Sequence, residues 1–368
     1  MKKNYKPGLL KKGVFSVIPL FLLLLFAEVF LRVFRPNLTT KSKFAIVSVF
    51  EKFHSPNPFN QSSDRSIRMR ERQPEFFQCI TPNYEQLSNS DALIEKEYCL
   101  TTDSNGFIQP SRIHSSPEIS IVFLGGSTTE CEFVSEKVRF PYLTGRLIES
   151  KLDKKTNSYN AACSGNNIMH SIDLLLHKVI PINPDIVVLM HAVNDWNVLV
   201  GEKTYWNSHH SKSLIIDPRS ESIFKKKNGS ISESDTAENY NLERIVFEYF
   251  QAQNLFVDIC ERYHIQPVLM TQSSRFTNEG DEIIHKGIRK FNKERGYSYS
   301  DSKLLQDTLN SITRTTAIQR GILLIDLDKE IPKTKEFMYD IVHYHDQGSK
   351  AIAAIISDSL ISRFKWNR

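Results

Sequence analysis

Residues 119–126 read Ile-Ser-Ile-Val-Phe-Leu-Gly-Gly, a short apolar run rich in β-branched side chains that ends in two glycines. Such a run predicts a buried strand followed by a sharp turn. The stretches PDIVVLMHAV (184–193), QPVLMTQ (266–272) and GILLIDL (321–327) have the same texture. The sequence therefore predicts at least four buried strands in the second two thirds of the chain.

Amphipathic stretches separate and follow these strands, at 142–152, 167–179, 242–263, 303–320 and 348–364. Their apolar positions recur with the spacing of a helix. Strands that alternate with helices form a parallel sheet covered on both faces, and functional residues gather at the C-terminal ends of its strands. The sequence predicts an α/β fold and directs attention to the residues after each strand.

Length and charge narrow the class of protein. The chain has 368 residues, of which 40% are hydrophobic, enough for one large domain with a sizeable core. The net charge of +5 arises from 47 basic and 42 acidic residues spread along the chain. Because no basic stripe stands out, the composition gives no support to nucleic-acid binding.

The N-terminal region contains one strongly apolar segment, residues 13–34, preceded by a tail (residues 1–12) that carries five lysines. About 20 apolar residues can span a bilayer as a helix. A cleaved signal peptide is the alternative, but bulky residues occupy the place of a small-x-small cleavage site. The sequence predicts a single-pass signal anchor, with the tail in the cytoplasm and the rest of the chain outside it.

Two further segments are distinguished by their polar composition. Residues 35–118 are irregular and rich in proline, and we interpret them as a juxtamembrane extension preceding a domain at 119–368. Residues 199–239 form a polar stretch within that domain, which we interpret as an inserted loop or lid.

The five cysteines show no CxxC pair and no histidine spacing typical of a zinc site, so we expect no metal and no other cofactor. Outside the cytoplasm Cys79 and Cys99 could form a disulfide that closes a loop. The alternative is that all five cysteines are free and serve as small apolar residues.

Ser127 directly follows the first predicted strand and the glycine pair. Glycine permits a sharp turn that leaves the hydroxyl accessible, as a nucleophile requires. Thr129 stands where the G-x-S-x-G elbow has a glycine, which excludes that motif. A helix N-cap or a phosphate-binding turn would explain Ser127 equally well if it stood alone.

The motif Asp340-Ile341-Val342-His343 precedes the last helix and offers an acid and an imidazole three residues apart. A serine hydroxyl becomes nucleophilic when a base takes its proton, and a carboxylate fixes the tautomer of that base. This spacing assigns the base to His343 and the carboxylate to Asp340. His345, in the same loop, is an alternative base.

Two stretches after other strands offer donors for an oxyanion, Asn160–Gly165 and His191–Asp195. A tetrahedral acyl-transfer intermediate is stabilised by N–H groups aimed at its negative oxygen. The backbone N–H of Gly165 and the side-chain amide of Asn194 fit that role. We expect Ser127 to form the oxyanion hole together with them.

Taken in order, these pieces resemble the SGNH hydrolase family, also called GDSL esterases and lipases. Its sequence blocks match Ser127 as nucleophile, Gly165 and Asn194 as oxyanion donors, and Asp340 with His343 as the D-x-x-H pair. The resemblance covers about residues 119–364. It implies a flavodoxin-like three-layer α/β/α sandwich and a serine esterase that needs no cofactor.

Two positions depart from the family pattern: Gly126 replaces the aspartate of Gly-Asp-Ser, and His191 stands where Gly-x-Asn-Asp has glycine. Neither change removes a catalytic atom. The resemblance implies a carboxylesterase or carbohydrate deacetylase that acts on an acylated small molecule or glycan. An O-acyltransferase that modifies a surface glycan, and an inactive surface binding protein, remain as alternatives.

Overall fold

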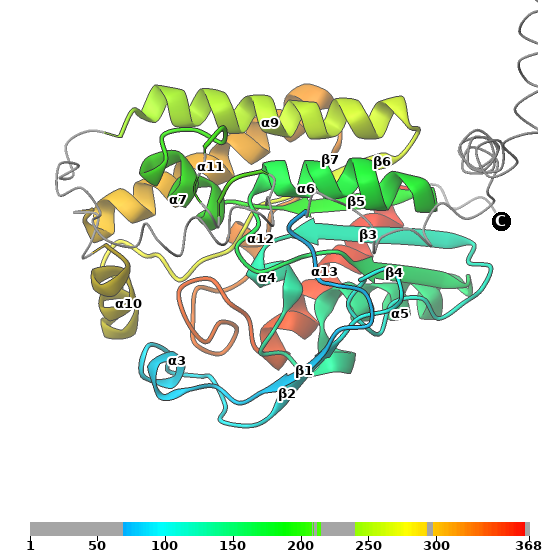
Figure 1. Cartoon of the computed structure of the whole chain (residues 1–368), viewed down its shortest axis with the longest axis horizontal. Helices are drawn as coiled ribbons and strands as arrows, with labels where there is room; N and C mark the ends of the chain where they lie inside the picture. The colour runs from blue at the N-terminus through cyan, green and yellow to red at the C-terminus, as the bar shows by residue number, and fades with distance from the viewer. Residues whose placement is uncertain (1–68, 208, 210–211, 215–239, 293–296, 365–368) are drawn as a thin grey trace, which may run out of the picture. The chain divides into compact units, whose positions relative to one another are not determined.

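A five-stranded parallel sheet forms the centre of the computed structural model (Figure 1), which describes residues 69–207, 209, 212–214, 240–292 and 297–364. The sheet strands are β3 (Ile119–Gly125), β4 (Thr156–Asn160), β5 (Ile186–Met190), β6 (Gln266–Met270) and β7 (Leu323–Ile325). Their spatial order is β4-β3-β5-β6-β7, and each neighbouring pair is parallel. Counted along the chain this is order 2-1-3-4-5, as in flavodoxin-like folds. The predicted α/β fold with a parallel sheet is confirmed.

Helices cover both faces of the sheet (Figure 1). One face carries α6 (Ile168–Leu174), α7 (Val193–Gly201), α9 (Leu242–Arg262) and α11 (Tyr299–Arg320). The other carries α5 (Phe140–Leu152) and α13 (Asp346–Arg363). Side chains alternate between these layers along β3, since Val122 and Leu124 pack with the first group while Ile121 and Phe123 pack with the second.

Shorter elements complete the domain. They are α4 (Ser127–Glu130), η2 (Glu136–Val138), η3 (Leu175–Val179), η4 (Ile180–Ile182), α10 (Glu282–Asn292) and α12 (Leu327–Glu330). The strand β4, with the sequence TNSYN, is not among the four strands that the sequence predicts. Its polar side chains are buried because they find partners: the Asn157 amide donates to the His114 carbonyl and the Asn160 amide to the Thr129 carbonyl.

Residues 69–118 are the described part of the predicted juxtamembrane extension. From Met69 onward it belongs to the same compact unit as the sheet. It contains an antiparallel pair, β1 (Phe77–Ile80) and β2 (Tyr98–Thr101), and the short helix α3 (Tyr84–Ser88). Phe107 and Ile108 are buried, and the Ile108 N–H donates to the Asn160 carbonyl at the end of β4. The described part of the extension therefore packs against the sheet.

The predicted insert at 199–239 begins inside α7, where Leu199 and Val200 are buried, and Tyr205 also belongs to the core. Residues 215–239 lie outside the described residues, as does the predicted anchor at 13–34. Among the helices that the structure describes, none combines the length and the apolar character needed to cross a bilayer.

Candidate active site

Ser127 begins α4, immediately beyond the C-terminal end of β3. The preceding residue, Gly126, lies against the side chain of Asn194: a Cβ atom at position 126 would stand 2.5 Å from the Asn194 Nδ2 and 3.1 Å from the Asn166 carbonyl oxygen. Position 126 therefore requires glycine for close approach rather than for an unusual backbone angle. The glycine that departs from the family pattern is the residue that this packing needs.

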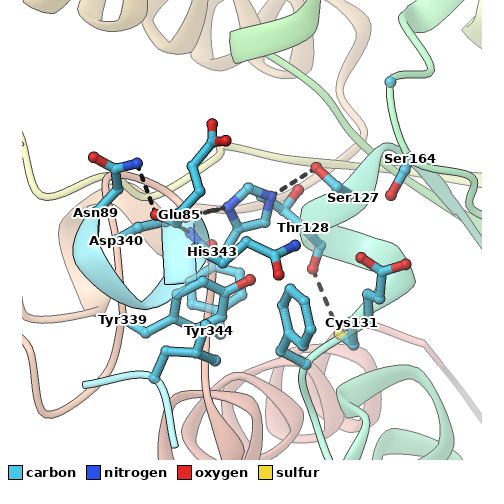
Figure 2. A pocket seen from close by; sticks show the side chains of 15 residues that line it. Glu85, Asn89, Ser127, Thr128, Cys131, Ser164, Tyr339, Asp340, His343 and Tyr344 are labelled. Carbon is cyan, nitrogen blue, oxygen red and sulfur yellow. Dashed lines mark hydrogen bonds and ion pairs between the residues drawn. The ribbon is translucent and has the colours of Figure 1, made fainter. Parts of the chain in front are cut away.

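A chain of hydrogen bonds links Ser127 to His343 and His343 to Asp340 (Figure 2). The Ser127 Oγ is 2.7 Å from the His343 Nε2, and the His343 Nδ1 is 2.8 Å from the Asp340 Oδ2. About a quarter of each of the His343 and Asp340 side chains is exposed, 27% and 26%. With its proton on Nδ1, the imidazole can accept the hydroxyl proton of Ser127 on Nε2.

Backbone hydrogen bonds within the loop 340–343 fix the position of Asp340 relative to His343. Asp340 Oδ1 accepts backbone N–H groups from Val342 at 2.9 Å and His343 at 2.7 Å. Burial by itself would raise the pKa of Asp340, but His343 and these hydrogen bonds lower it below its ordinary value. Burial likewise opposes the charged form of His343, yet the Asp340 carboxylate raises the pKa of the imidazole above its ordinary value. The pair is arranged to stabilise an imidazolium.

His345, the alternative base, lies elsewhere. Its Nδ1 accepts the N–H of Gln347 at the start of α13, and its Nε2 is 3.0 Å from the Lys335 carbonyl oxygen. The neighbouring Asp346 accepts the backbone N–H and the hydroxyl of Ser135. Of the two histidines in this loop, the structure brings His343 to Ser127 and uses His345 as a helix cap.

The two predicted oxyanion donors, Gly165 and Asn194, both lie near the turn that carries Ser127. Gly165 has a φ of +80°, a left-handed conformation that favours glycine, and it lines the same cavity as Ser127. Asn194, in the first turn of α7, donates one amide hydrogen to the Asn166 carbonyl at 2.9 Å. A primary amide has a second hydrogen to offer. Since Gly126 lies against this amide, Asn194 stands next to Ser127.

Two arginines from the segment before β1 hold the loop that carries Gly165. Arg72 pairs with Glu130, which is fully buried and accepts both the N–H and the hydroxyl of Ser164. Arg70 donates to the Ser164 carbonyl at 2.8 Å and to the Asn166 Oδ1 at 3.2 Å. Sequence reasoning missed these residues because they lie in a stretch without periodicity, 58 to 96 residues from their partners.

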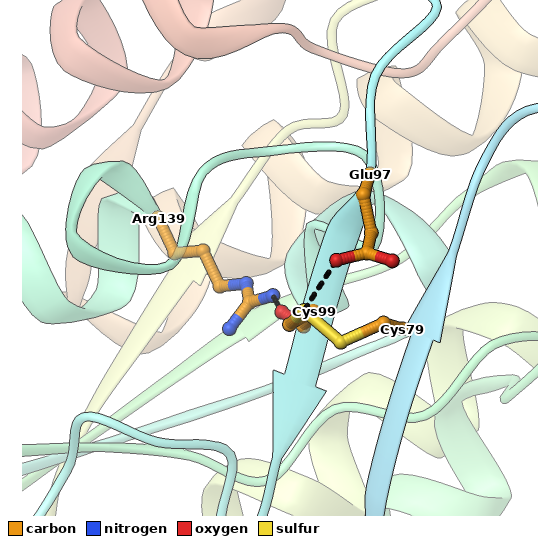
Figure 3. The surroundings of a disulfide bond; sticks show 4 residues. All are labelled: Cys79, Glu97, Cys99 and Arg139. Atoms are coloured by element: carbon orange, nitrogen blue, oxygen red, sulfur yellow. Dashed lines mark hydrogen bonds between the residues drawn. A yellow bond between two sulfur atoms is a disulfide. The ribbon is translucent and has the colours of Figure 1, made fainter.

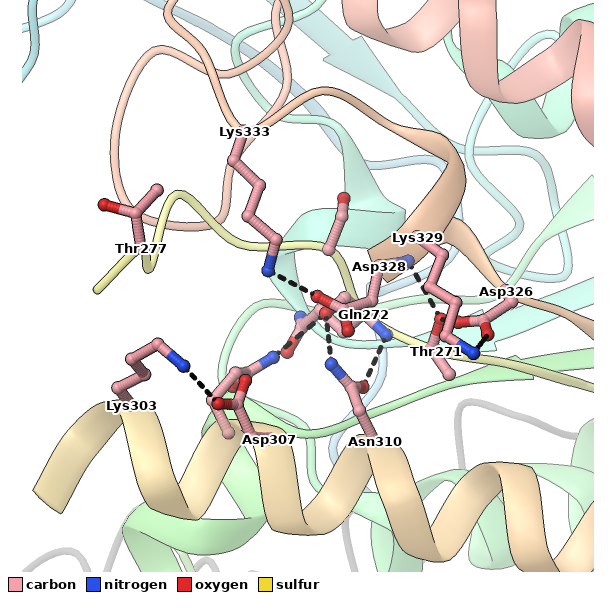
Figure 4. A network of polar contacts seen from close by, with 12 residues as sticks. Thr271, Gln272, Thr277, Lys303, Asp307, Asn310, Asp326, Asp328, Lys329 and Lys333 are labelled. Atoms are coloured by element: carbon pink, nitrogen blue, oxygen red, sulfur yellow. Dashed lines mark hydrogen bonds and ion pairs between the residues drawn. The ribbon is translucent and has the colours of Figure 1, made fainter. Parts of the chain in front are cut away.

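Gln272, just beyond β6, is a second residue that sequence reasoning missed (Figure 4). Its amide donates to the Thr128 hydroxyl at 2.9 Å, and its Oε1 accepts the Val193 N–H at 2.8 Å. Asn310 in turn bonds both the N–H and the carbonyl of Gln272. Gln272 thereby links the residue after Ser127 to the residue before Asn194. Its place at a strand end was the available signal.

A cavity of about 360 Å³ opens over Ser127. The side that contains Ser127 is formed by Ser127, Thr128, Cys131, Glu132, Phe133, Ser164, Gly165, Tyr339, Asp340, His343 and Tyr344. Facing them are four residues from the segment 79–99, which a disulfide between Cys79 and Cys99 closes into a loop (Figure 3). Arg139, itself buried, donates to the Cys99 carbonyl at 2.5 Å and ties the loop to the core.

Comparisons with known proteins found matches among solved structures only. No protein-family model matches the chain, and no curated protein matches its sequence. An acetylxylan esterase from Geobacillus stearothermophilus is 16% identical, with a TM-score of 0.42 over 69% of this chain and 98% of that chain. A lipase/acylhydrolase from Enterococcus faecalis is 17% identical, with a TM-score of 0.42 over 68% and 99%.

A putative GDSL-like lipase from Parabacteroides merdae is also similar, at 14% identity and a TM-score of 0.41 over 67% of this chain and 97% of that chain. These identities are too low to transfer an activity, because one fold hosts many functions. Function has to be inferred from the site.

Proposed function

We propose that the protein is a serine-dependent ester hydrolase of the SGNH type that acts through an acyl-enzyme on Ser127. The observation that carries this proposal is the contact of 2.7 Å between the Ser127 Oγ and the His343 Nε2, with Asp340 2.8 Å behind the imidazole. The three groups open into a cavity large enough for a small ester or part of a larger one.

In the proposed reaction the Ser127 oxygen attacks the ester carbonyl while His343 takes the hydroxyl proton. The negative oxygen that develops is stabilised by N–H groups of Ser127, Gly165 and the Asn194 side chain. Collapse of the intermediate breaks the ester C–O bond, and the imidazolium protonates the leaving alcohol. Water then attacks the acyl-enzyme by the same proton path, which releases the acid and restores Ser127. Asp340 stabilises the imidazolium in both steps.

The substrate class follows from this chemistry as an O-acylated small molecule or glycan, with carbohydrate deacetylation as the specific activity we propose. The acyltransferase alternative shares the acyl-enzyme and differs only in whether an alcohol replaces water. A relic binding site is disfavoured because Ser127, His343 and Asp340 keep the hydrogen-bond distances that proton transfer requires. The reaction as derived uses no metal and no cofactor.

The test is to incubate the full-length protein, extracted in detergent, with an O-acetylated oligosaccharide and a free acceptor oligosaccharide. We expect mass spectrometry to detect free acetate and deacetylated sugar, and the Ser127→Ala variant to produce neither. Acetylated acceptor in place of free acetate would assign the transferase reaction instead. No product from a protein whose Ser127 resists a fluorophosphonate probe would refute the serine-hydrolase proposal.

We also propose that residues 13–34 anchor the protein in a membrane, with the catalytic domain outside the cytoplasm. The Cys79–Cys99 disulfide supports this placement, since such bonds persist in oxidising compartments. Protease added to intact cells, or to spheroplasts where an outer membrane is present, should digest the domain. Full protection of the domain with protease access verified would contradict this placement.

A further inference from the structure

The segment that follows β6, residues 271–276, forms neither helix nor strand, and yet it is buried. Each of its side chains is at most 3% exposed. A buried irregular stretch needs partners for its backbone N–H and carbonyl groups, which is why most loops run over the surface. This segment finds part of its partners in the loop that carries Asp340 and His343, residues 338–343, which we call the base loop.

Arg275 binds the base loop at two points. Its backbone N–H donates to the Ile341 carbonyl at 2.8 Å, and its guanidinium Nη1 donates to the Met338 carbonyl at 3.3 Å. In the chain, Met338 precedes Asp340 and Ile341 follows it. Arg275 therefore holds the base loop on both sides of the catalytic acid.

Two carboxylates fix the guanidinium of Arg275. Asp91 accepts hydrogen bonds from Nη1 and Nη2 at 2.5 and 2.8 Å, a bidentate geometry, and Asp281 accepts one from Nη2 at 2.5 Å. The Arg275 side chain is 3% exposed, whereas those of Asp91 and Asp281 are 24% and 45% exposed. Because a buried charge depends on its partners, removal of the bidentate Asp91 should displace the guanidinium.

Asp91 also contacts the base loop directly, since its N–H donates to the Tyr339 carbonyl at 3.2 Å. The Tyr339 N–H in turn donates to the His343 carbonyl at 2.9 Å. The Tyr339 ring stacks on the His343 imidazole, with 5.6 Å between centroids and 9° between planes (Figure 2). Asp91 and Arg275 thus hold the residue that packs on the imidazole.

Neither Arg275 nor Asp91 is among the residues that line the cavity over Ser127. Resting on the ester hydrolase proposed above, we propose that these two residues form a positioning pair. The pair holds the base loop so that His343 keeps its hydrogen bonds to Ser127 and Asp340 at the same time. Because a displacement of about 1 Å can reduce a catalytic rate by about 10²-fold, the pair acts on kcat and not on substrate binding.

The first test is steady-state kinetics of the full-length protein, extracted in detergent, with phenyl acetate as substrate. We expect Arg275→Met to lower kcat by about 30- to 100-fold and to change KM by less than about threefold, because the base loop shifts while the cavity lining remains. Arg275→Lys keeps the charge but cannot bind Asp91 through a planar fork, so it should restore part of the rate. Asp91→Asn should lower kcat by about tenfold.

A double variant tests whether the two residues act as one unit. Asp91→Asn combined with Arg275→Met should be no slower than Arg275→Met alone, since both substitutions break the same contact. Losses that multiply in the double variant would overturn the pairing. All rates are measured below the thermal transition of each variant, and Arg275→Lys and Asp91→Asn carry the test if Arg275→Met does not fold.

Two control variants separate positioning from stability. Asp281→Asn removes a negative charge from the same guanidinium but leaves the Asp91 contact, so kcat should stay within about twofold of the wild type. Arg320→Met breaks an ion pair to Asp258 on α9, neither of which lines the cavity, and kcat should again be unchanged. An unaltered kcat in folded Arg275→Met, or equal losses in Asp281→Asn and Asp91→Asn, would overturn the inference.

An NMR measurement separates failure of this inference from failure of the proposed function. A proton on the His343 Nδ1 that is hydrogen-bonded to Asp340 resonates far downfield, and its signal in protein with isotopically labelled histidine is assigned by its absence from His343→Ala. We expect this signal in the wild type and its loss in Arg275→Met. That result without ester cleavage and without fluorophosphonate labelling of Ser127 would refute the hydrolase and leave the positioning of His343 in place. An active enzyme whose signal and kcat both survive Arg275→Met would refute the positioning pair alone.

Discussion

Two groups of serine, histidine and aspartate occur among the described residues. They have the same composition but differ in exposure, in the hydrogen bonds of the aspartate and in their pKa shifts. The pocket triad consists of Ser127, His343 and Asp340. The buried triad consists of Ser171 on α6, His191 after β5 and Asp195 on α7. In both groups 2.7 Å separates the serine oxygen from the histidine Nε2. The serine–histidine distance therefore does not distinguish a catalytic site from a structural contact.

The aspartates distinguish the two groups. In the buried triad the His191 Nδ1 is 3.4 Å from the Asp195 Oδ2, and that oxygen makes no hydrogen bond among the described residues. Burial lowers the pKa of His191 to about 3 and raises that of Asp195 to about 7, although Ile168 and Tyr205 donate to the carboxylate.

In the pocket triad both pKa shifts have the opposite sign. Burial opposes the charged forms there too, but Asp340 and His343 stabilise each other as an ion pair, and the N–H groups of Val342 and His343 further lower the pKa of Asp340. Ion-pair stabilisation, and not residue identity, prepares a histidine to act as a base. The buried triad instead joins the starts of α6 and α7, and so helps to place Asn194, the neighbour of Asp195.

The largest expected effect comes from removing the nucleophile or the base of the pocket triad. Ser127→Ala and His343→Ala should each reduce turnover by about 10⁵- to 10⁶-fold, because these groups act as one unit. Asp340→Asn should cost about 10⁴-fold, since it favours the wrong tautomer. Initial rates on an aryl acetate and labelling by a fluorophosphonate measure both effects.

Ser171→Ala is the matched substitution in the buried triad. It removes one buried hydrogen bond to His191, so we expect labelling of Ser127 to persist while the free energy of unfolding falls by about 1–3 kcal/mol. If Ser171→Ala abolishes labelling of Ser127 in a folded protein, or if His343→Ala leaves labelling intact, the distinction between a catalytic pocket triad and a structural buried triad is wrong.

Asn194→Ala should reduce kcat by about 10²- to 10³-fold, because one oxyanion donor is lost while the nucleophile and the base remain. Steady-state kinetics would show a fall in kcat with little change in KM. Asn197→Ala, farther along the same helix, is the control. Loss of substrate affinity without loss of kcat would show that Asn194 binds the ground state instead.

Arg72→Ala should lower kcat by about 10- to 100-fold, since Glu130 would lose its partner and the loop carrying Gly165 would move. Arg72→Lys should restore part of the rate, and Arg112→Ala, at an exposed arginine between β2 and β3, should have no effect. A change confined to thermal stability, with kcat unaltered in the folded variant, would make Arg72 a structural residue only.

The smallest expected effect is a displacement of the pH profile. His343 acts as a base only when neutral, so activity should fall as the pH decreases through its pKa, which lies above the ordinary value of 6.5. Asp340→Asn removes the charge that raises this pKa and should move the acid limb of kcat/KM to lower pH. His345→Ala should leave it in place. A limb that Asp340→Asn does not move would exclude Asp340 as the partner of the base.

The comparison also shows why some of the site was predictable from the sequence. The D-x-x-H spacing lies within one loop, and the glycine pair before Ser127 is adjacent to its strand, so both signals are local. Arg70 and Arg72 carry no local signal, because each acts on a residue distant in the chain, and the only local signal for Gln272 is its place after a strand. The buried role of His191 was equally hidden, since a polar residue after a strand reads the same whether it faces solvent or core.

The sequence by itself predicted the parallel α/β architecture and singled out Ser127, His343 and Asp340, which the structure brings to hydrogen-bond distance. The spacing of apolar residues, the apolar runs and the D-x-x-H motif suffice for these predictions, because each reflects contacts within one helix, strand or loop. The tertiary structure decided which serine, histidine and aspartate open to a cavity. It also showed that residues 69–99, part of the predicted juxtamembrane extension, hold the loop that carries Gly165 and form a wall of the cavity over Ser127. The reason is physical: burial and hydrogen bonds between distant segments set the pKa and the accessibility of a side chain, and they exist only once the chain has folded.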